Sequence, residues 1–241
     1  MPNDYFQFKE FTIYQDRSTL KVSTDSCILG AWAAKKLATL EFHVSGCLDI
    51  GAGTGLLMLM LAQQFPGTIQ GIEIDKDSYE QATENIKTSA WCNRLHLFYD
   101  DIKLFSAPHR YDFIISNPPF FEGDLKSNLA KNNFAKHSDG LKLSDLLEVV
   151  NRNLTVKGSF AVLLPLHRMD YFVQVAASND LFVAEKLLIR QSPKHPFFRC
   201  ALLMNRKNNG LVKTEELTIR QTPETYTLSF IRLMKEYYLY L

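Results

Sequence analysis

Apolar and polar positions recur with two periods along the chain, and each period predicts a different kind of element. Short apolar runs predict buried strands at residues 68–75, 95–101, 111–120, 158–165, 181–190 and 199–206. Apolar residues at helical spacing predict helices at 24–40, near 144–154, near 167–178 and through Tyr79, Ala82 and Ile86. The run 46–65 predicts a strand, a glycine turn and a buried helix in succession.

Strands and helices alternate along most of the sequence, which predicts an α/β fold with a parallel sheet and right-handed crossovers. The last two strands have no helix-length segment between them, so we expect an antiparallel hairpin at one edge. The result is a Rossmann-like sheet, mostly parallel, that binds ligands where its strands end. We expect one domain over 1–241, with 1–23 as an extension or hairpin and 24–241 as the catalytic core.

The two flanks of this core carry their own signals. Thr24 and Asp25 are predicted N-caps of the helix at 24–40. Residues 224–241 are expected to form a final helix that packs its aromatic face on the body, and the alternative is a partner-binding helix.

Composition narrows the picture without naming a partner. The chain has 241 residues, 46% of them hydrophobic, which is enough for one substantial core. Its 27 Lys and Arg residues balance 26 Asp and Glu residues, so a nucleic-acid surface must come from local clustering. The 4 cysteines form no C-x-x-C pair, and we expect no metal site. With neither the roughly 18 apolar residues of a membrane span nor a signal-peptide pattern, we expect a cytoplasmic protein without membrane or obligate protein partners.

A glycine-rich turn follows the first strand of the core. Gly51, Gly53 and Gly55 let the backbone turn tightly and approach a ligand. Position 56 is Leu56, so the spacing is G-x-G-x-G and differs from that of a dinucleotide fingerprint. Asp49, two residues before the turn, is placed to contact an ammonium group or to order water beneath a cationic methionine moiety.

Acidic residues also follow the next two strands. Glu73 is predicted to accept hydrogen bonds from both hydroxyls of a ribose, with Asp75 as the competing residue. Asp101 is predicted to accept from an adenine amino group, and its alternative role is to cap a helix. The order of these features predicts a nucleoside cofactor.

The fourth core strand ends in Asn117, Pro118, Pro119 and Phe120. A conjugated exocyclic amine is a poor nucleophile because its lone pair is delocalised. The Asn117 side-chain oxygen and the Pro118 carbonyl can each accept one N–H and turn that lone pair toward a methyl group on a sulfonium. Consecutive prolines keep the turn rigid, Phe120 can stack on a planar substrate, and orientation and electrostatics supply the rate. The alternative is that N-P-P is only a loop; we also expect Asn117 to border the cofactor.

With these residues the chain resembles the class I methyltransferases that carry N-P-P-[YF], over nearly its whole length. Within that group it is similar to the bacterial tRNA1(Val) adenine-N6 methyltransferases in LKVSTDSCILGAWA, CLDIGAGTGLLMLMLAQQ, ENI, DFIISNPPF and YYLYL. The resemblance implies a seven-stranded sheet, the cofactor S-adenosyl-L-methionine, and methylation of an adenine N6 in tRNA, next to the anticodon of a valine tRNA. It also implies that Lys21, Thr24 and Asp25 help to close the cofactor pocket.

Two positions depart from the pattern of this group. Phe120 stands where Tyr is commoner, so stacking is kept and a hydroxyl is lost. Ser23 stands where many relatives have Gly. The release-factor glutamine methyltransferases share N-P-P-Y but carry an N-terminal helical domain, for which the residues before Thr24 leave no room. Glutamine methylation and a non-catalytic cofactor-binding module remain the alternative functions.

Two segments are expected to contact RNA. Residues 186–213 contain no Asp or Glu, and their basic side chains can contact phosphates beside Phe197 and Phe198 as stacking platforms. The residues concerned are Lys186, Arg190, Lys194, Arg199, Arg206 and Lys207, with Lys126, Lys131 and Lys136 in the loop that follows the proline motif. The alternative for 186–213 is a solvated hairpin whose acidic partners lie elsewhere. The sequence leaves open which of the two segments dominates.

Overall fold

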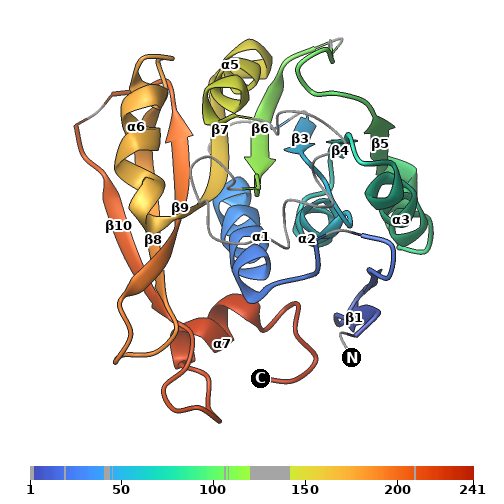
Figure 1. The fold of residues 1–241 in the computed structure, drawn as a ribbon, viewed down its shortest axis with the longest axis vertical. Helices are drawn as coiled ribbons and strands as arrows, with labels where there is room; N and C mark the ends of the chain where they lie inside the picture. The colour runs from blue at the N-terminus through green and yellow to red at the C-terminus, as the bar shows by residue number, and fades with distance from the viewer. Residues whose placement is uncertain are drawn as a thin grey trace, which may run out of the picture.

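The computed structural model describes residues 3–18, 20–40, 44, 46–105, 107, 109–119, 142–208 and 210–241. Within them, eight strands form one sheet (Figure 1). In spatial order they are β10 (Lys213–Thr218), β8 (Phe182–Arg190), β9 (Phe197–Asn205), β7 (Leu154–Pro165), β6 (Tyr111–Ser116), β3 (Gly46–Ile50), β4 (Thr68–Glu73) and β5 (Leu95–Tyr99). β9 runs antiparallel to both of its neighbours, and the other pairs are parallel.

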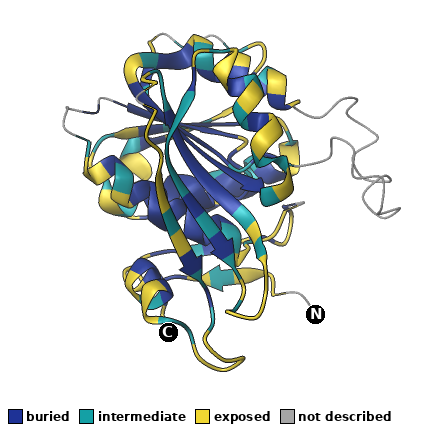
Figure 2. Ribbon diagram, turned by 90° about the vertical axis from the view of Figure 1, so that its left-hand side faces the viewer, coloured by how far each residue is buried: buried dark blue, intermediate teal, exposed yellow. Residues whose placement is uncertain are grey.

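Helices cover both faces of this sheet. Along β3 and β6 the side chains alternate between the faces, because successive residues of a strand point in opposite directions. Cys47, Phe113 and Ile115 pack on one side with α1 (Thr24–Ala38), α2 (Leu56–Gln64), α3 (Lys76–Lys87) and α7 (Leu228–Met234). Leu48 and Ile114 pack on the other side with α5 (Leu143–Asn153) and α6 (Met169–Ala177). Figure 2 shows the buried strands between helices whose outer faces are exposed.

The predicted fold class is confirmed, with one strand more than the seven expected. The hairpin of β8 and β9 is present, but β10 pairs in parallel with β8 and forms the edge of the sheet. The sequence of β10, KTEELT, contains one apolar residue, Leu217, and therefore has no strand-like apolar run. Its pairing depends on the backbone, which a hydrophobic pattern does not record.

The prediction that Thr24 and Asp25 cap the first helix is wrong. The N-cap of α1 is Ser23, whose Oγ accepts from the Ser26 backbone N–H at 3.2 Å. Thr24 and Asp25 are the first residues of the helix itself. Ser23 has an extended backbone that an N-cap needs, and the choice among three adjacent capping residue types is not visible in the sequence.

The N-terminal hairpin is present as β1 (Tyr5–Gln7) and β2 (Thr12–Tyr14), which pair in antiparallel fashion. Phe8 forms an isolated β-bridge with Tyr238, and the Lys9 N–H donates to the Tyr237 carbonyl at 2.9 Å. The final helix predicted over 224–241 is shorter than expected, since α7 spans only Leu228–Met234. After it, Tyr237 and Tyr238 are buried against the body, whereas Tyr240 is exposed. Residues 8 and 238, far apart in sequence, are therefore joined through their backbones.

Candidate functional site

The carboxyl ends of the parallel strands β3, β4, β5 and β6 meet at one edge of the sheet. There β3 leads into the turn at residues 51–55, in which Gly51, Gly53 and Gly55 have φ values of 75°, 56° and 80°. The Gly51 and Ala52 N–H groups both donate to the Ile72 carbonyl at 3.0 Å, which fixes the turn to the end of β4. Left-handed backbone explains why this position requires glycine, since other residues are strained there.

The three glycines differ in their surroundings. A Cβ added at Gly51 or Gly53 would meet no atom within 4 Å, so both face open space. A Cβ added at Gly55 would lie 3.5 Å from the Ala82 side chain. Gly51 and Gly53 thus leave room for a ligand against the backbone, whereas Gly55 allows α2 and α3 to approach each other.

Asp49 lies beneath this turn as a buried carboxylate without a partner. Its exposed fraction is 0%, and neither of its carboxylate oxygens accepts a hydrogen bond from the residues that the structure describes. Burial, reinforced by the negative charge of Glu73, raises the pKa of Asp49 to about 8. A buried carboxylate of this kind is stabilised by a cation or by hydrogen-bond donors from a ligand.

Glu73, at the end of β4, lies against the same turn. Its two oxygens accept from the Gly53 and Asp75 N–H groups, each at 2.8 Å. Burial raises the pKa of Glu73, and these two hydrogen bonds oppose the rise. Asp75, the competing residue, caps α3 by accepting from the Ser78 N–H at 2.9 Å. Glu73 is therefore the acid that touches the glycine turn, and Asp75 serves the helix.

Asp101 begins a turn after β5. Its Oδ1 accepts from the Lys103 N–H at 2.9 Å, and its carbonyl accepts from Leu104 and Phe105. The residues that follow form turns and no regular helix in the described part of the chain, so Asp101 caps a turn. Its side chain is half-buried, and the interaction with an adenine amino group remains a prediction.

Ile74 is an apolar residue at this edge that the sequence analysis missed. It follows Glu73 directly, outside β4, and 56% of its surface is exposed. The apolar run 68–75 predicted Ile74 as a buried strand residue, and this is wrong because β4 ends at Glu73. The sequence does contain one signal for a role in the site, since a large apolar residue directly after a strand-end acid can cover the face of a base.

The proline turn lies beside the glycine turn. β6 pairs with β3, and the Ser116 Oγ donates to the Ile50 carbonyl at 2.8 Å, so the ends of the two strands are fixed together. Asn117 and Pro119 are half-buried and Pro118 is buried. The arrangement places the Asn117 backbone directly after the strand that adjoins Asp49. Phe120 lies outside the described residues.

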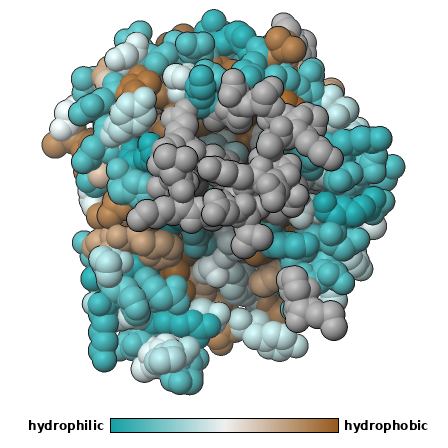
Figure 3. Space-filling model, viewed as in Figure 1, coloured by the Kyte–Doolittle hydropathy of each residue, from teal (hydrophilic) through white to brown (hydrophobic). Residues whose placement is uncertain are grey.

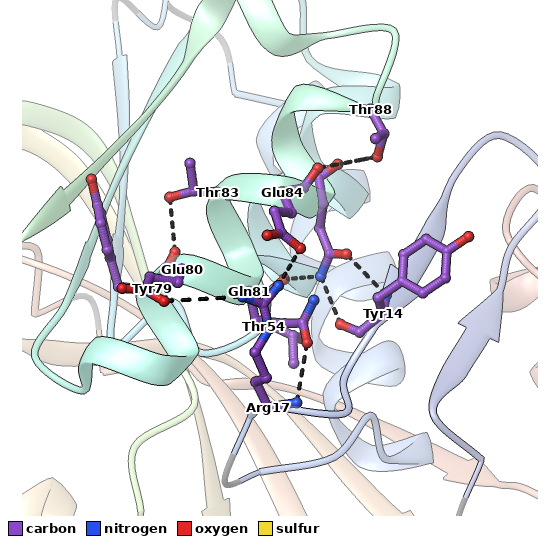
Figure 4. A network of polar contacts seen from close by, with 10 residues as sticks. Tyr14, Arg17, Thr54, Tyr79, Glu80, Gln81, Thr83, Glu84 and Thr88 are labelled. Atoms are coloured by element: carbon purple, nitrogen blue, oxygen red, sulfur yellow. Dashed lines mark hydrogen bonds and ion pairs between the residues drawn. The ribbon is translucent and has the colours of Figure 1, made fainter.

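Residues 15–18 and 20–25, between the N-terminal hairpin and the first turn of α1, contact α3 and β9. At one end, the Arg17 N–H donates to the Gln81 Oε1 at 3.2 Å, and the Arg17 side chain pairs with Glu84 (Figure 4). At the other end, the Asp25 carboxylate accepts from the Arg199 Nε at 2.9 Å.

Asn85 of α3 joins the N-terminal hairpin to the glycine turn. Its amide nitrogen donates to the carbonyls of Tyr14 and Thr54, each at 2.9 Å. The Lys21 ammonium donates to the Gln15 carbonyl, and Thr24 starts α1. Asp25 thus lies at the edge where β7 ends, through its ion pair with Arg199. The role of Lys21, Thr24 and Asp25 in closing the cofactor pocket stays a prediction.

The basic stretch 186–213 is divided by the sheet. Arg199 is the register partner of Pro165 at the carboxyl end of β7, and Arg190 is the partner of Phe197. Asn205, at the other end of β9, is the partner of Phe182, so Arg206 and Lys207 lie at the opposite edge. The predicted RNA-contacting residues of this stretch therefore fall on two opposite edges of the sheet, with Arg190 and Arg199 at one and Arg206 and Lys207 at the other. Lys126, Lys131 and Lys136 lie outside the described residues.

Some of these basic side chains are bound within the protein, by carbonyl oxygens or by acidic side chains. Arg206 donates to the Asn151 and Leu154 carbonyls at 2.8 and 3.4 Å. Lys213 forms ion pairs with Glu185 and Glu215 at 3.4 and 3.5 Å. Acidic residues just outside the stretch thus pair with Lys213 at its C-terminal end. For that end, this agrees with the alternative of a solvated hairpin whose acidic partners lie elsewhere.

Two kinds of feature are absent from the described residues. No group of three or more His, Cys, Asp or Glu side chains within them is arranged to hold a metal ion. Nor do they include a helix with the length and apolar character that crossing a membrane requires.

Comparison with known proteins decides the family. A family model described as the methyltransferase small domain matches residues 33–180. The tRNA1(Val) (adenine(37)-N6)-methyltransferase of Trichodesmium erythraeum is 39% identical over 99% of each chain. That of Bacteroides fragilis is 35% identical, again over 99% of each. The chain belongs to the tRNA1(Val) adenine-N6 methyltransferase family.

Membership of this family confirms the resemblance found in the sequence. It makes the chain an S-adenosyl-L-methionine-dependent methyltransferase. Among solved structures, a predicted O-methyltransferase from Agrobacterium tumefaciens matches with a TM-score of 0.64 at 14% identity, covering 87% of this chain and 95% of that one. This likeness supports the class I methyltransferase fold.

Proposed function

We propose that this chain methylates N6 of an adenine in tRNA, at the adenine adjacent to the anticodon of a valine tRNA. The observation that carries the proposal is the Asn117-Pro118-Pro119 turn, which follows β6 beside the glycine turn and the unpaired carboxylate of Asp49. The full-length relatives bear the name of this activity. We propose the cytoplasm, where tRNA is modified, as its location.

The residues of the edge fit S-adenosyl-L-methionine. Asp49 offers a buried negative charge to the methionine ammonium, and open space in front of Gly51 and Gly53 admits the ligand against the backbone. Glu73 holds two oxygens near the same space for the ribose, although each already accepts one N–H. Asp101 and Ile74 are assigned to the adenine, by hydrogen bonding and by contact with its face. When bound, the cofactor supplies a methyl group on a positively charged sulfur.

The protein activates the substrate amine by orienting it. The Asn117 side-chain oxygen and the Pro118 carbonyl accept the two N–H groups of the adenine amine, which directs its lone pair toward the methyl group. Two successive prolines hold the turn rigid, so these acceptors are oriented before the reaction begins. The amine loses a proton only after it has gained positive charge, so no base acts before attack. Phe120 is assigned to stack on the adenine ring.

A direct assay tests this proposal. The protein is incubated with methyl-labelled S-adenosyl-L-methionine and unmodified total tRNA, and the tRNA is then digested to nucleosides. We expect label in N6-methyladenosine. Label that resists nuclease and is released by protease would instead indicate methylation of a protein glutamine. Cofactor binding by calorimetry without transfer to RNA, DNA or protein would indicate a binding module.

A further inference from the structure

Arg190, the last residue of β8, is held in a fixed orientation at the edge of the sheet that carries the glycine and proline turns. The Arg190 guanidinium carbon lies 4.9 Å from the centroid of the Phe197 ring. Its Nε donates to the Thr218 Oγ1 at 2.8 Å. Among the residues that the structure describes, no carboxylate forms an ion pair with Arg190. Its orientation is thus set by a ring and a hydroxyl, and its positive charge is not neutralised by an ion pair.

A second pair of an arginine and an aromatic ring follows in β9. The Arg199 guanidinium carbon lies 5.8 Å from the centroid of the Phe198 ring, and its Nε is bound to Asp25 of α1. Phe198 is 37% exposed. The ion pair therefore ties the start of β9 to α1, while the neighbouring ring remains accessible.

These side chains lie at the same edge of the sheet as the proline turn. In the sheet, β8, β9, β7 and β6 are successive neighbours, and their ends at Arg190, Arg199, Pro165 and Ser116 share one edge. Neighbouring strands are about 4.8 Å apart, so the three steps from β6 to β8 span about 14 Å. The connection between β8 and β9 adds Lys194, which is exposed. Its side of the molecule is largely hydrophilic in Figure 3, at the lower left.

The combination fits an unpaired stretch of RNA. Loops are recognised by stacking their bases on aromatic rings and by binding their phosphates with arginine and lysine. Phe198 offers the ring, and Arg190 and Lys194 offer charges that no described carboxylate pairs with. The far half of the same basic stretch lacks this combination, because Arg206 is bound to carbonyls at the opposite edge.

We propose that Arg190, Lys194 and Phe198 form the surface that binds the tRNA loop next to the target adenine. Arg190 and Lys194 bind phosphates, and Phe198 stacks on an unpaired base. Arg199 and Asp25 act as positioning residues, because their ion pair holds the start of β9, and with it Phe198, against α1. The inference rests on the proposed function, since tRNA is its partner.

Binding is measured apart from methylation, so the two proposals fail separately. Fluorescence anisotropy with labelled valine tRNA gives Kd, and a salt series gives the dependence on ionic strength. We expect Phe198→Ala to raise Kd about 5-fold or more, since loss of one stacked base has that size. Lys194→Gln and Arg190→Gln should raise Kd and each reduce the salt slope by about one.

The matched control is Arg206→Gln, in the same basic stretch but at the opposite edge. It should leave the Kd for tRNA within about twofold of wild type, and calorimetry should give unchanged affinity for S-adenosyl-L-methionine in all four variants. Lys194 is exposed, so Lys194→Gln should unfold at the wild-type temperature. Phe198 is 37% exposed, so Phe198→Ala should unfold slightly below that temperature and remain folded in the binding assay. Wild-type Kd in the Phe198 and Lys194 variants, or an equal loss in Arg206→Gln, would overturn the proposed surface. If tRNA binding behaves as expected but N6-methyladenosine is absent, only the proposed function fails.

Discussion

At the scale of single residues, the burial of Asp49 makes the stability of the free protein depend on pH. Its pKa is raised to about 8, against an ordinary value of 3.8. The folded protein therefore binds the proton more tightly than the unfolded chain does. Stability from this residue is present below pH 4 and is lost as the pH rises through about 8.

Asp49→Asn should therefore stabilise the free protein at alkaline pH. At pH 8 we expect a Tm at least about 2–4 °C above wild type, the shift that 1 kcal/mol gives in a protein of this size. The difference should shrink toward pH 5, as differential scanning calorimetry over a pH series would show. The same variant should bind S-adenosyl-L-methionine more weakly. A variant that is less stable at pH 8 would mean that donors in the protein already satisfy the carboxylate.

The strongest prediction at this scale concerns Asn117→Ala. The change removes an acceptor that is used mainly as the amine reaches its transition state, and it leaves the glycine turn intact. Turnover should fall roughly 10²–10³-fold, which corresponds to about 2.7–4 kcal/mol. Single-turnover kinetics with saturating cofactor and tRNA measures the loss, and calorimetry should show unchanged cofactor affinity. A rate within about threefold of wild type would exclude Asn117 as the orienting acceptor.

The sequence predicted residues of the site whose role depends on strand position, and missed those that depend on contacts. Asp49, Glu73 and Asn117 could be predicted as site residues because the sequence places each at or just beyond a strand end, and the structure places them there. The exposure of Ile74 depends on where β4 ends. The predicted strand continued to Asp75, two residues beyond the observed end at Glu73. Cap choice at Ser23 depends on backbone angles, which no local pattern encodes.

At the scale of elements, the glycine turn makes a prediction with an internal control. Gly53→Ala places a Cβ in the open space of the turn, at a φ of 56°. Left-handed backbone costs a residue with a Cβ about 1–2 kcal/mol. We expect this loss of stability together with a large loss of affinity for S-adenosyl-L-methionine. Gly210→Ala also has open space and a φ of 68°, so it should show the same strain with normal affinity.

Calorimetry on both variants separates the two effects. If Gly53→Ala binds the cofactor as tightly as Gly210→Ala does, the ligand does not approach the backbone at residue 53. The assignment of the turn would then have to move to Gly51, the other glycine that faces open space.

Elements were predicted well where burial is continuous and poorly where pairing depends on the backbone. β3, β6 and residues 158–165 of β7 are buried and appear as apolar runs, whereas β7 begins four residues earlier, where Val156 and Lys157 are exposed. β10 is exposed at half of its positions and pairs with β8 at the edge of the sheet, so its side chains carry little hydrophobic signal. The division of the basic stretch also follows from topology, since β9 carries Arg199 and Arg206 to opposite edges.

At the scale of the whole molecule, Tyr238 joins the last segment to the N-terminal hairpin. Its ring lies 5.6 Å from that of Phe6 and 6.0 Å from those of Phe8 and Phe230. Tyr238→Ala should cost about 3–5 kcal/mol, as for other large buried rings. With about 2–4 °C lost per kcal/mol, Tm should fall by about 6–20 °C. Thermal unfolding followed by circular dichroism measures the change.

Tyr240→Ala is the matched control, because that ring is 87% exposed. Its stability should stay within about 0.5 kcal/mol of wild type. If both variants lost the same stability, the contacts of Tyr238 with Phe6, Phe8 and Phe230 would not be what stabilises the segment. The sequence predicted that this segment packs on the body, but its partner was not readable, since nothing local connects residues 8 and 238.

The β-bridge between Phe8 and Tyr238 also sets an order of events during synthesis. A ribosome adds about 5–20 residues per second, so Tyr238 is made roughly 10–45 s after Phe8. The ion pair between Asp25 and Arg199 likewise waits for β9. The nascent chain can form its glycine turn and proline turn while the segment that borders them still lacks two of its anchors. We therefore expect the nascent chain to acquire cofactor affinity late, after most of its sheet has folded, and the cofactor to stabilise the finished protein more than its folding intermediates.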